Sequence, residues 1–201
     1  MQWRTGLAWA GWYVSTQLFT PAVFATLGAA IAGRLGMTLN LINVISATSI
    51  AWMDTKAAPM GQMAAQRDWD KLDRTYGKAF WQTMVVWALG CVALLLLIQI
   101  LRWFGHPIGQ RVIDLPTTLV FMAAAGVIQI VLCRSIYQRA HKAELLYGWH
   151  LASGCIVAGI LLLTSRLGLF YLSVAYLLCA CVPLLLISQL IFTNFRTKMH
   201  T

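Results

Sequence analysis

The sequence predicts an all-α membrane protein, one bundle of six transmembrane helices, and two observations carry this prediction. Of the 201 residues, 60% are hydrophobic and only 10% are charged, whereas a soluble domain carries roughly 25% charged residues. The charges also leave long uncharged runs, at residues 5–33, 35–53, 79–101, 115–133, 145–165 and 167–195. Each run can cross a ~30 Å hydrocarbon core as a helix, which takes about 20 residues. Barrel strands would instead be ~10 residues long and would alternate in polarity.

The spans are expected in a single domain, residues 1–201, at residues 7–32, 38–53, 79–101, 115–133, 145–164 and 168–195. The first run exceeds the apolar core of a signal peptide, about 7–15 residues, and is expected to be a retained span. Gly33–Thr38 is expected to form the turn that follows it. Pro21 and Pro183 fall inside the first and sixth spans, where a proline removes a backbone hydrogen bond and kinks the helix.

Residues 54–78 are expected to form an amphipathic loop on the cytoplasmic side. They hold nine of the 21 charged residues and four of the six acids. Pro59 and Gly61 are expected to end the second span, with Pro59 as a further kink. A helix over Met63–Tyr76 would then lie flat on the membrane. Its apolar side would be formed by residues at spacings of three and four, namely Trp69, Leu72 and Tyr76.

The distribution of positive charge predicts the topology. Four of the 15 basic residues, Arg34, Arg102, Arg111 and Arg166, fall on one side of a six-span arrangement, and the other eleven share a side with the N-terminus. Basic residues are enriched in cytoplasmic loops, so both termini are expected in the cytoplasm. The net charge of +9 is therefore assigned to topology and to contact with anionic membrane lipids. A nucleic-acid partner is not expected, because no basic soluble face is present.

Catalytic and metal-binding motifs are missing from the sequence. No acid or base lies at the centre of a predicted span, although intramembrane charge is the usual mark of a proton or ion pathway. The five cysteines show no CxxC or Cys/His ligand spacing, so neither a disulfide framework nor a zinc site is indicated. An enzyme is not expected, and no cofactor or metal is implied. The function classes that remain are a carrier, a channel and a scaffold.

Two stretches carry a resemblance to a known family. Gln17–Ala47 reads QLFTPAVFATLGAAIAGRLGMTLNLINVISA, and Trp52–Arg74 contains W-x-x-T-K-x-x-P followed by G-Q-x-A-x-x-R-D-W-x-x-L-D. Read with these stretches, the chain resembles the C-terminal half of a bacterial polysaccharide or lipid-linked oligosaccharide (O-antigen-type) flippase of the MATE-like superfamily. The resemblance implies two bundles of about six spans that rock by alternating access in the inner membrane. It also implies that this chain works with a missing N-terminal bundle or a second copy, or that it is a truncated remnant.

The same resemblance implies a substrate path for a lipid-linked or polymeric glycan. Lys56, Arg67 and Arg74 could gather a diphosphate-linked substrate, since Lys and Arg suit phosphate; otherwise they only set the topology. The cavity lining could include Gln17, Asn43 and Trp52, with Asp54 at the cytoplasmic helix end; otherwise these residues serve helix packing. Pro21, Pro59 and Pro183 are the expected hinges. The alternative to a flippase is a non-transporting scaffold for polysaccharide-synthesis enzymes; a drug or metabolite exporter is a variant of the same fold.

Overall fold

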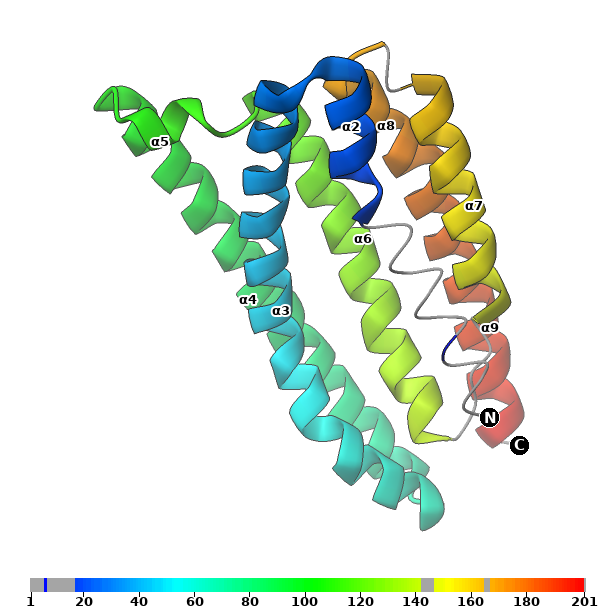
Figure 1. The fold of residues 1–201 in the computed structure, drawn as a ribbon. Helices are drawn as coiled ribbons and strands as arrows, with labels where there is room; N and C mark the ends of the chain where they lie inside the picture. Colours follow the sequence, from blue (N-terminus) through cyan, green and yellow to red (C-terminus); the bar gives the residue numbers. More distant parts are fainter. Residues whose placement is uncertain (1–5, 7–16, 142–146, 165–166, 201) are drawn as a thin grey trace.

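The computed structural model describes residues 6, 17–141, 147–164 and 167–200, and every regular element within these ranges is helical. The elements, drawn in Figure 1, are α2 (Phe19–Leu27), α3 (Ala29–Ala65), α4 (Trp69–Trp103), α5 (Pro107–Gln110), α6 (Leu115–Ala140), α7 (Tyr147–Thr164), α8 (Leu169–Tyr176), the π-helical turn η1 (Leu177–Cys181) and α9 (Val182–His200). The all-helical prediction is confirmed for these residues.

Within the described residues, four helical rods are long and apolar enough to cross a membrane: α3, α4, α6 and the continuous stretch Leu169–Asn194 from α8 into α9. They indicate a membrane-embedded protein. The helix α7, with 18 residues, occupies most of the fifth predicted span, residues 145–164. Residues 7–16 of the first predicted span lie outside the described residues.

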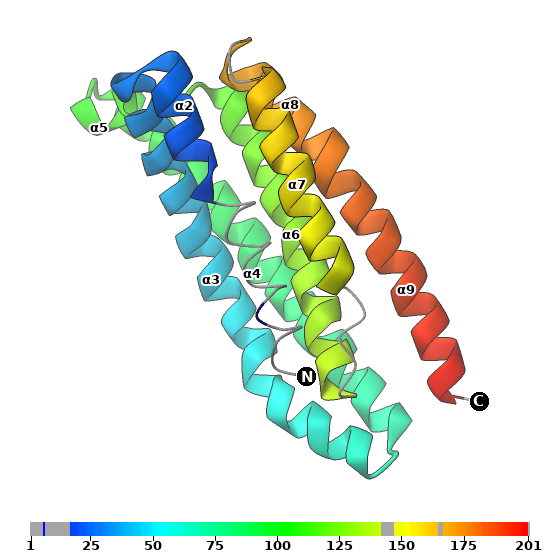
Figure 2. The ribbon, with the colours of Figure 1, turned by 45° about the vertical axis from the view of Figure 1, so that its right-hand side comes forward.

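The helix α6 lies at the centre of the bundle. It contacts α3 and α4 on one side and α8, η1 and α9 on the other. Figures 1 and 2 show α3 and α4 as a long antiparallel pair that extends past the lower end of α6. The short α2 packs against the upper part of α3, and α7 packs against α8. An aromatic contact joins these layers: Phe19 of α2 meets Phe121 of α6 and Tyr176 of α8 edge to face, with ring centroids 5.8 and 4.7 Å apart.

The chain turns between α2 and α3 at Gly28, and the expected turn at Gly33–Thr38 is wrong. Gly28 has φ 89° and ψ 170° between α2 and α3, a conformation that is essentially restricted to glycine. Gly33 and Gly36 stay inside α3. The expectation placed the turn near Arg34, but an arginine is tolerated near a helix end because its long side chain reaches the interface.

The expected amphipathic loop at residues 54–78 is the tip of a helical hairpin. Neither Pro59 nor Gly61 ends the second span, because α3 continues to Ala65 and α4 begins at Trp69. The separate flat helix over Met63–Tyr76 is therefore also wrong. With 37 residues, α3 is about 55 Å long, which exceeds a ~30 Å hydrocarbon core. The charged ends of α3 and α4 consequently extend the hairpin beyond the apolar part of the bundle.

The three prolines occupy different helical contexts. Pro21 lies in the first turn of α2, directly after a bend at Leu18. Pro59 lies inside α3, where its ring has no N–H for the carbonyl four residues earlier. Pro183 follows the π-helical turn η1, and a π-turn of this kind lets a helix continue past a proline with a local change of direction.

Candidate functional site

One side of α3 carries small and polar side chains over its membrane-length part. Successive members are three or four residues apart, so they lie on the same side of the helix. All are exposed except Gly36, which is half-buried. We call this surface the polar face of α3; it consists of Gly33, Gly36, Asn40, Asn43, Ala47, Ala51, Asp54 and Ala58.

The exposed side of α4 has the opposite composition. Its large exposed apolar side chains are Trp81, Val85, Leu89, Val92, Leu96, Leu97, Ile100 and Trp103. On α3 only Val44 and Trp52 belong to that class, and α3 is the least hydropathic of the four candidate spans. Hydrocarbon offers no partner to a polar atom, so α4 has the composition of a lipid-facing surface. The polar face of α3 has that of a cavity wall or a helix–helix contact.

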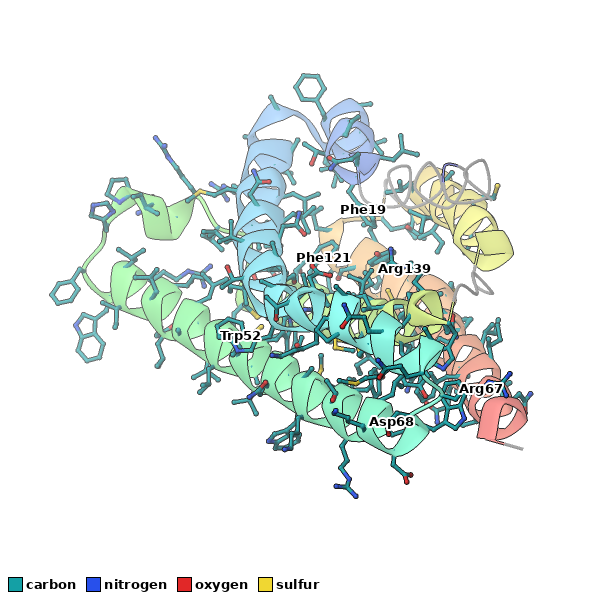
Figure 3. The ribbon with its side chains drawn as sticks, turned by 90° about the horizontal axis from the view of Figure 1, so that it is seen from below. Phe19, Trp52, Arg67, Asp68, Phe121 and Arg139 are labelled. Atoms are coloured by element: carbon teal, nitrogen blue, oxygen red, sulfur yellow. The ribbon has the colours of Figure 1, made fainter. Side chains whose placement is uncertain are left out.

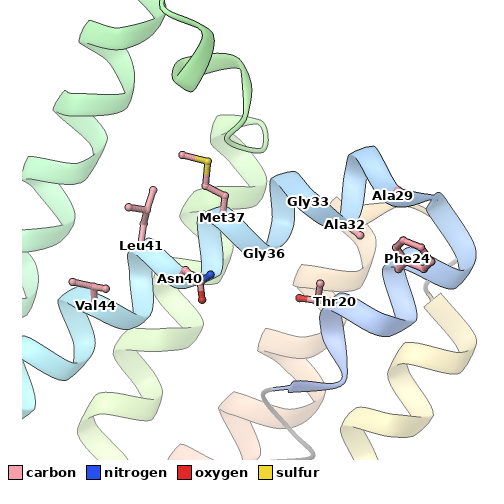
Figure 4. A pocket seen from close by; sticks show the side chains of 10 residues that line it. All are labelled: Thr20, Phe24, Ala29, Ala32, Gly33, Gly36, Met37, Asn40, Leu41 and Val44. Atoms are coloured by element: carbon pink, nitrogen blue, oxygen red, sulfur yellow. The ribbon is translucent and has the colours of Figure 1, made fainter.

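An open groove of about 660 Å³ lies at the upper end of the polar face of α3. Figure 4 shows Thr20 and Phe24 of α2 on one side and Asn40 of α3 on the other. Its floor is formed by residues without bulky side chains, namely Ala29, Ala32, Gly33 and Gly36. A Cβ atom built on Gly33 would meet nothing within 4 Å, so the groove is open at that point. Asn40 joins the groove to the rest of the polar face.

The residues that the sequence predicted for a substrate path do not form one site. The structure places Asn43 and Asp54 on the polar face of α3, three helical turns apart. Trp52 is 43% exposed and lies on the side of α3 nearest α4 (Figure 3). Lys56, one turn further, shares that side. Gln17 is exposed just before α2 and does not line the groove.

The two remaining predicted residues are Arg67, in the turn at the tip of the hairpin, and Arg74, on α4. Arg67 is exposed in the turn between α3 and α4 and has φ 58°, in the left-handed region where glycine is favoured. Its N–H donates to the carbonyl of Ala64 at 3.2 Å. The next residue, Asp68, caps α4 by accepting a 3.3 Å hydrogen bond from the N–H of Lys71. Figure 3 shows Arg67 and Asp68 side by side in this turn. Arg74 is exposed further along α4.

A charged contact that the sequence did not predict joins α6 to α9. The guanidinium of half-buried Arg134 donates from Nη1 to the hydroxyl of Ser188 at 2.7 Å and to the carbonyl of Leu185 at 3.4 Å. Its Nη2 donates to the side-chain oxygen of Gln189. The guanidinium carbon also lies 5.9 Å from the ring centroid of Phe192, within the range of a cation–π contact.

Aromatic side chains from α4, α6 and α9 meet below this contact. The ring of Tyr137 lies edge to face with Tyr76 and Phe192, at centroid distances of 4.9 and 5.2 Å. The hydroxyl of Tyr137 donates a 2.8 Å hydrogen bond to Asp73. One turn away, Trp69 stacks on His141 at 5.4 Å. This side of α4 therefore packs against α6.

A polar contact also lies inside the bundle. Gln129 of α6 is fully buried and donates from Nε2 to the hydroxyl of Ser49 at 2.7 Å and to the carbonyl of Ser46 at 3.2 Å. The side-chain oxygens of Gln129 and Ser46 are buried and have no partner among the described residues. This contact fixes the register of α6 against α3.

The sequence does contain a signal for the contact between Arg134 and α9, which the prediction did not include. Arg134 follows directly on an uncharged run, and the prediction ended the fourth span there. The pair Ser188–Gln189 interrupts an apolar run in the sixth span, and polar residues in a membrane helix need partners. A basic residue at the end of one span and a polar pair in another are a candidate contact. For the aromatic cluster, the sequence predicted that Trp69 and Tyr76 share a side of one helix, but it did not indicate their partners on α6 and α9.

Comparisons with known proteins found no family model, no curated protein and no solved structure that matches the chain. In the part of the chain that the structure describes, no group of three or more His, Cys, Asp or Glu side chains could hold a metal ion. The polar face of α3, with its groove, is therefore the candidate site.

Proposed function

We propose that the chain forms one wall of the substrate path of a membrane transport protein. In this proposal it moves a lipid-linked or polymeric glycan across a bacterial inner membrane, with both termini cytoplasmic. The observation that carries the proposal is the contrast between the polar face of α3 and the apolar exposed side of α4. The resemblance of Trp52–Arg74 to the flippase pattern gives the substrate class.

The chemistry of the polar face suits a hydrated sugar. The amides of Asn40 and Asn43 offer both donors and acceptors to hydroxyl groups, as a carbohydrate requires. The alanines between Asn43 and Ala58 leave room beside the helix for a bulky group. Exposure of these amides and of Asp54 to hydrocarbon is unfavourable, because polar groups inside a membrane face a bundle interior or a water-filled cavity.

A single wall requires a partner on its other side. We propose that this partner is a second bundle, either from the same longer polypeptide or from a second copy of the chain, and that the two rock by alternating access. The exposed cations Lys56, Arg67 and Arg74 at the charged end would then attract the phosphate groups of the substrate.

The same face supports a second candidate function, a non-transporting scaffold. Ala47, Ala51 and Ala58 are small residues at helical spacing, and such residues let another helix approach closely in a membrane. In a scaffold this face would be filled by a permanent partner helix, and no substrate would pass.

Glycan transfer in proteoliposomes with a matched pair of variants separates the two functions. Ala47→Trp fills the polar face, whereas Leu89→Trp adds the same ring to the lipid-facing side of α4. The two positions lie at similar depth, since a Cβ on Gly90 would lie 2.6 Å from Ile45. Transport predicts that Ala47→Trp abolishes transfer and Leu89→Trp preserves it, at equal protein levels. Equal transfer by both variants, or none by the unaltered chain with its partner bundle, contradicts the proposal.

A further inference from the structure

Arg134 has hydrogen-bonding capacity that its partners on α9 do not use. A guanidinium has five N–H donors in a planar fork. Its Nη1 donates to the Ser188 hydroxyl and the Leu185 carbonyl, and its Nη2 donates to the side-chain oxygen of Gln189. The Nε–H and the second Nη2–H have no acceptor among the residues that the structure describes.

The two unused donors have the geometry that a phosphate group needs. Ser188 accepts from Nη1 and Gln189 accepts from Nη2, the two nitrogens at the end of the fork. The remaining Nε–H and Nη2–H lie along the side of the fork. Two parallel donors of this kind bind two oxygens of one phosphate, and such charge-assisted bidentate contacts are stronger than neutral ones.

The charge of Arg134 has no carboxylate partner in the described part of the chain. Its hydrogen-bond acceptors are a hydroxyl, a carbonyl and an amide, and Phe192 supplies only a ring face. Neutral acceptors orient a guanidinium but leave its full positive charge in place. A half-buried cation held in this way attracts an anion from outside the protein.

Arg134 lies at the edge of the bundle next to a surface that fits lipid chains. On α9, Gln189 is exposed, and its neighbours Leu186 and Leu190 are 59% and 62% exposed. Arg134 also lies in the last turns of α6, near the end that faces the charged hairpin. An acyl chain could lie along the two leucines while its headgroup reaches the guanidinium.

We propose that Arg134 binds the phosphate group of an anionic phospholipid at the seam between α6 and α9. The lipid belongs to the leaflet at the hairpin end, and its acyl chains lie along Leu186 and Leu190. Basic pockets between membrane helices bind lipid headgroups in this way. The proposal does not depend on the transport function, because the seam lies on different helices from the polar face of α3.

Native mass spectrometry of the purified full chain tests this site, with phosphatidylglycerol as the probe. The unaltered chain should retain the lipid on titration. Arg134→Lys should bind it about tenfold more weakly, the fold-change expected when a charge-assisted hydrogen bond is lost. A lysine has three donors, which match the three acceptors on α9, so this variant should keep the α6–α9 contact and its thermal stability.

Two further variants separate lipid binding from packing. Gln189→Ala removes one acceptor but leaves the guanidinium, and it should lower stability while lipid binding is kept. Arg139→Lys makes the same exchange at an exposed arginine of α6 and should leave lipid binding unchanged. Equal lipid affinity of Arg134→Lys and the unaltered chain overturns the proposal.

Two other probes identify the source of the phosphate. Inorganic phosphate offers the oxygens without acyl chains, and a polyprenyl phosphate represents the lipid carrier of a glycan. Phosphatidylglycerol should bind more tightly than inorganic phosphate, and its binding should persist when the polyprenyl phosphate is absent. Binding of inorganic phosphate as tight as that of the lipid, or binding of the polyprenyl phosphate alone, contradicts a phospholipid site.

Discussion

Gln129 of α6 donates a 2.7 Å hydrogen bond to the hydroxyl of Ser49 on α3, and both side chains are fully buried. Two helices far apart in the sequence are thus held at one relative height by an amide and a hydroxyl. In the same place the side-chain oxygens of Gln129 and Ser46 are buried without a partner in the described residues. The contact therefore gives specificity of packing more than stability.

A double-mutant cycle on this pair measures its strength. Ser49→Ala and Gln129→Met each remove one partner, and each should lower the free energy of unfolding. The double variant should lose less than the sum, because an apolar pair leaves no donor without an acceptor. We expect a coupling of about 1 kcal/mol, in the range of interhelical hydrogen bonds in membranes. Strictly additive losses contradict a direct contact.

Two helical glycines should respond oppositely to alanine. A Cβ on Gly126 would lie 2.8 Å from the ring of Trp87, whereas a Cβ on Gly33 would meet nothing within 4 Å. Gly126→Ala should therefore destabilise the protein by about 1–3 kcal/mol through overpacking. Gly33→Ala should stabilise it by about 0.5–1 kcal/mol, because alanine costs less entropy in a helix. Thermal unfolding of the two variants measures both effects. Equal shifts of the melting temperature in Gly126→Ala and Gly33→Ala contradict the packing of α4 on α6.

Arg67 can be removed without disturbing the hairpin. Its φ of 58° is unfavourable for a residue with a side chain and costs nothing for glycine. Arg67→Gly should therefore keep or raise thermal stability while it deletes one cation. If Arg67 gathers a phosphate-bearing substrate, glycan transfer should fall at an unchanged protein level. Unchanged transfer assigns Arg67 to the turn alone.

The hairpin tip and the end of α6 should lie on the same side of the membrane. Figure 1 shows both at the lower end of the bundle, with α5 at the upper end. Reporter fusions after Gln66 and after His141 should therefore agree with each other and differ from a fusion after Gly105. The positive-inside rule places the first two in the cytoplasm. A fusion after Gly105 that agrees with the other two contradicts the arrangement of the spans.

The sequence predicted the helical membrane class because composition and run length report it directly. It misplaced two boundaries for physical reasons. Helix ends were assigned to charges and to Pro59, but a helix continues into water where its backbone bonds to itself, as α3 does to Ala65. The true turn depends on the backbone of Gly28, which looks no different in sequence from Gly33.

Sequence reasoning identified only part of the candidate site. Asn43 and Asp54 were expected to line a path, and both lie on the polar face of α3. The apolar side formed by Trp69, Leu72 and Tyr76 exists, with Leu72 fully buried. It packs on Tyr137 and His141 of α6, because helical periodicity shows which residues share a side and not what covers them. The partners of Arg134 also depend on a contact 54 residues away in sequence.

The most direct test of the account is the water accessibility of the polar face of α3. The five native cysteines are first replaced by alanine. A single cysteine is then placed at Ala47 or at Leu89, and native membranes that contain each variant are treated with a water-soluble maleimide. If the polar face lines a substrate path, Ala47→Cys reacts rapidly and is protected by glycan substrate, while Leu89→Cys at similar depth stays unreactive in lipid. If both cysteines are equally unreactive, the face is covered by protein or lipid and does not line a path.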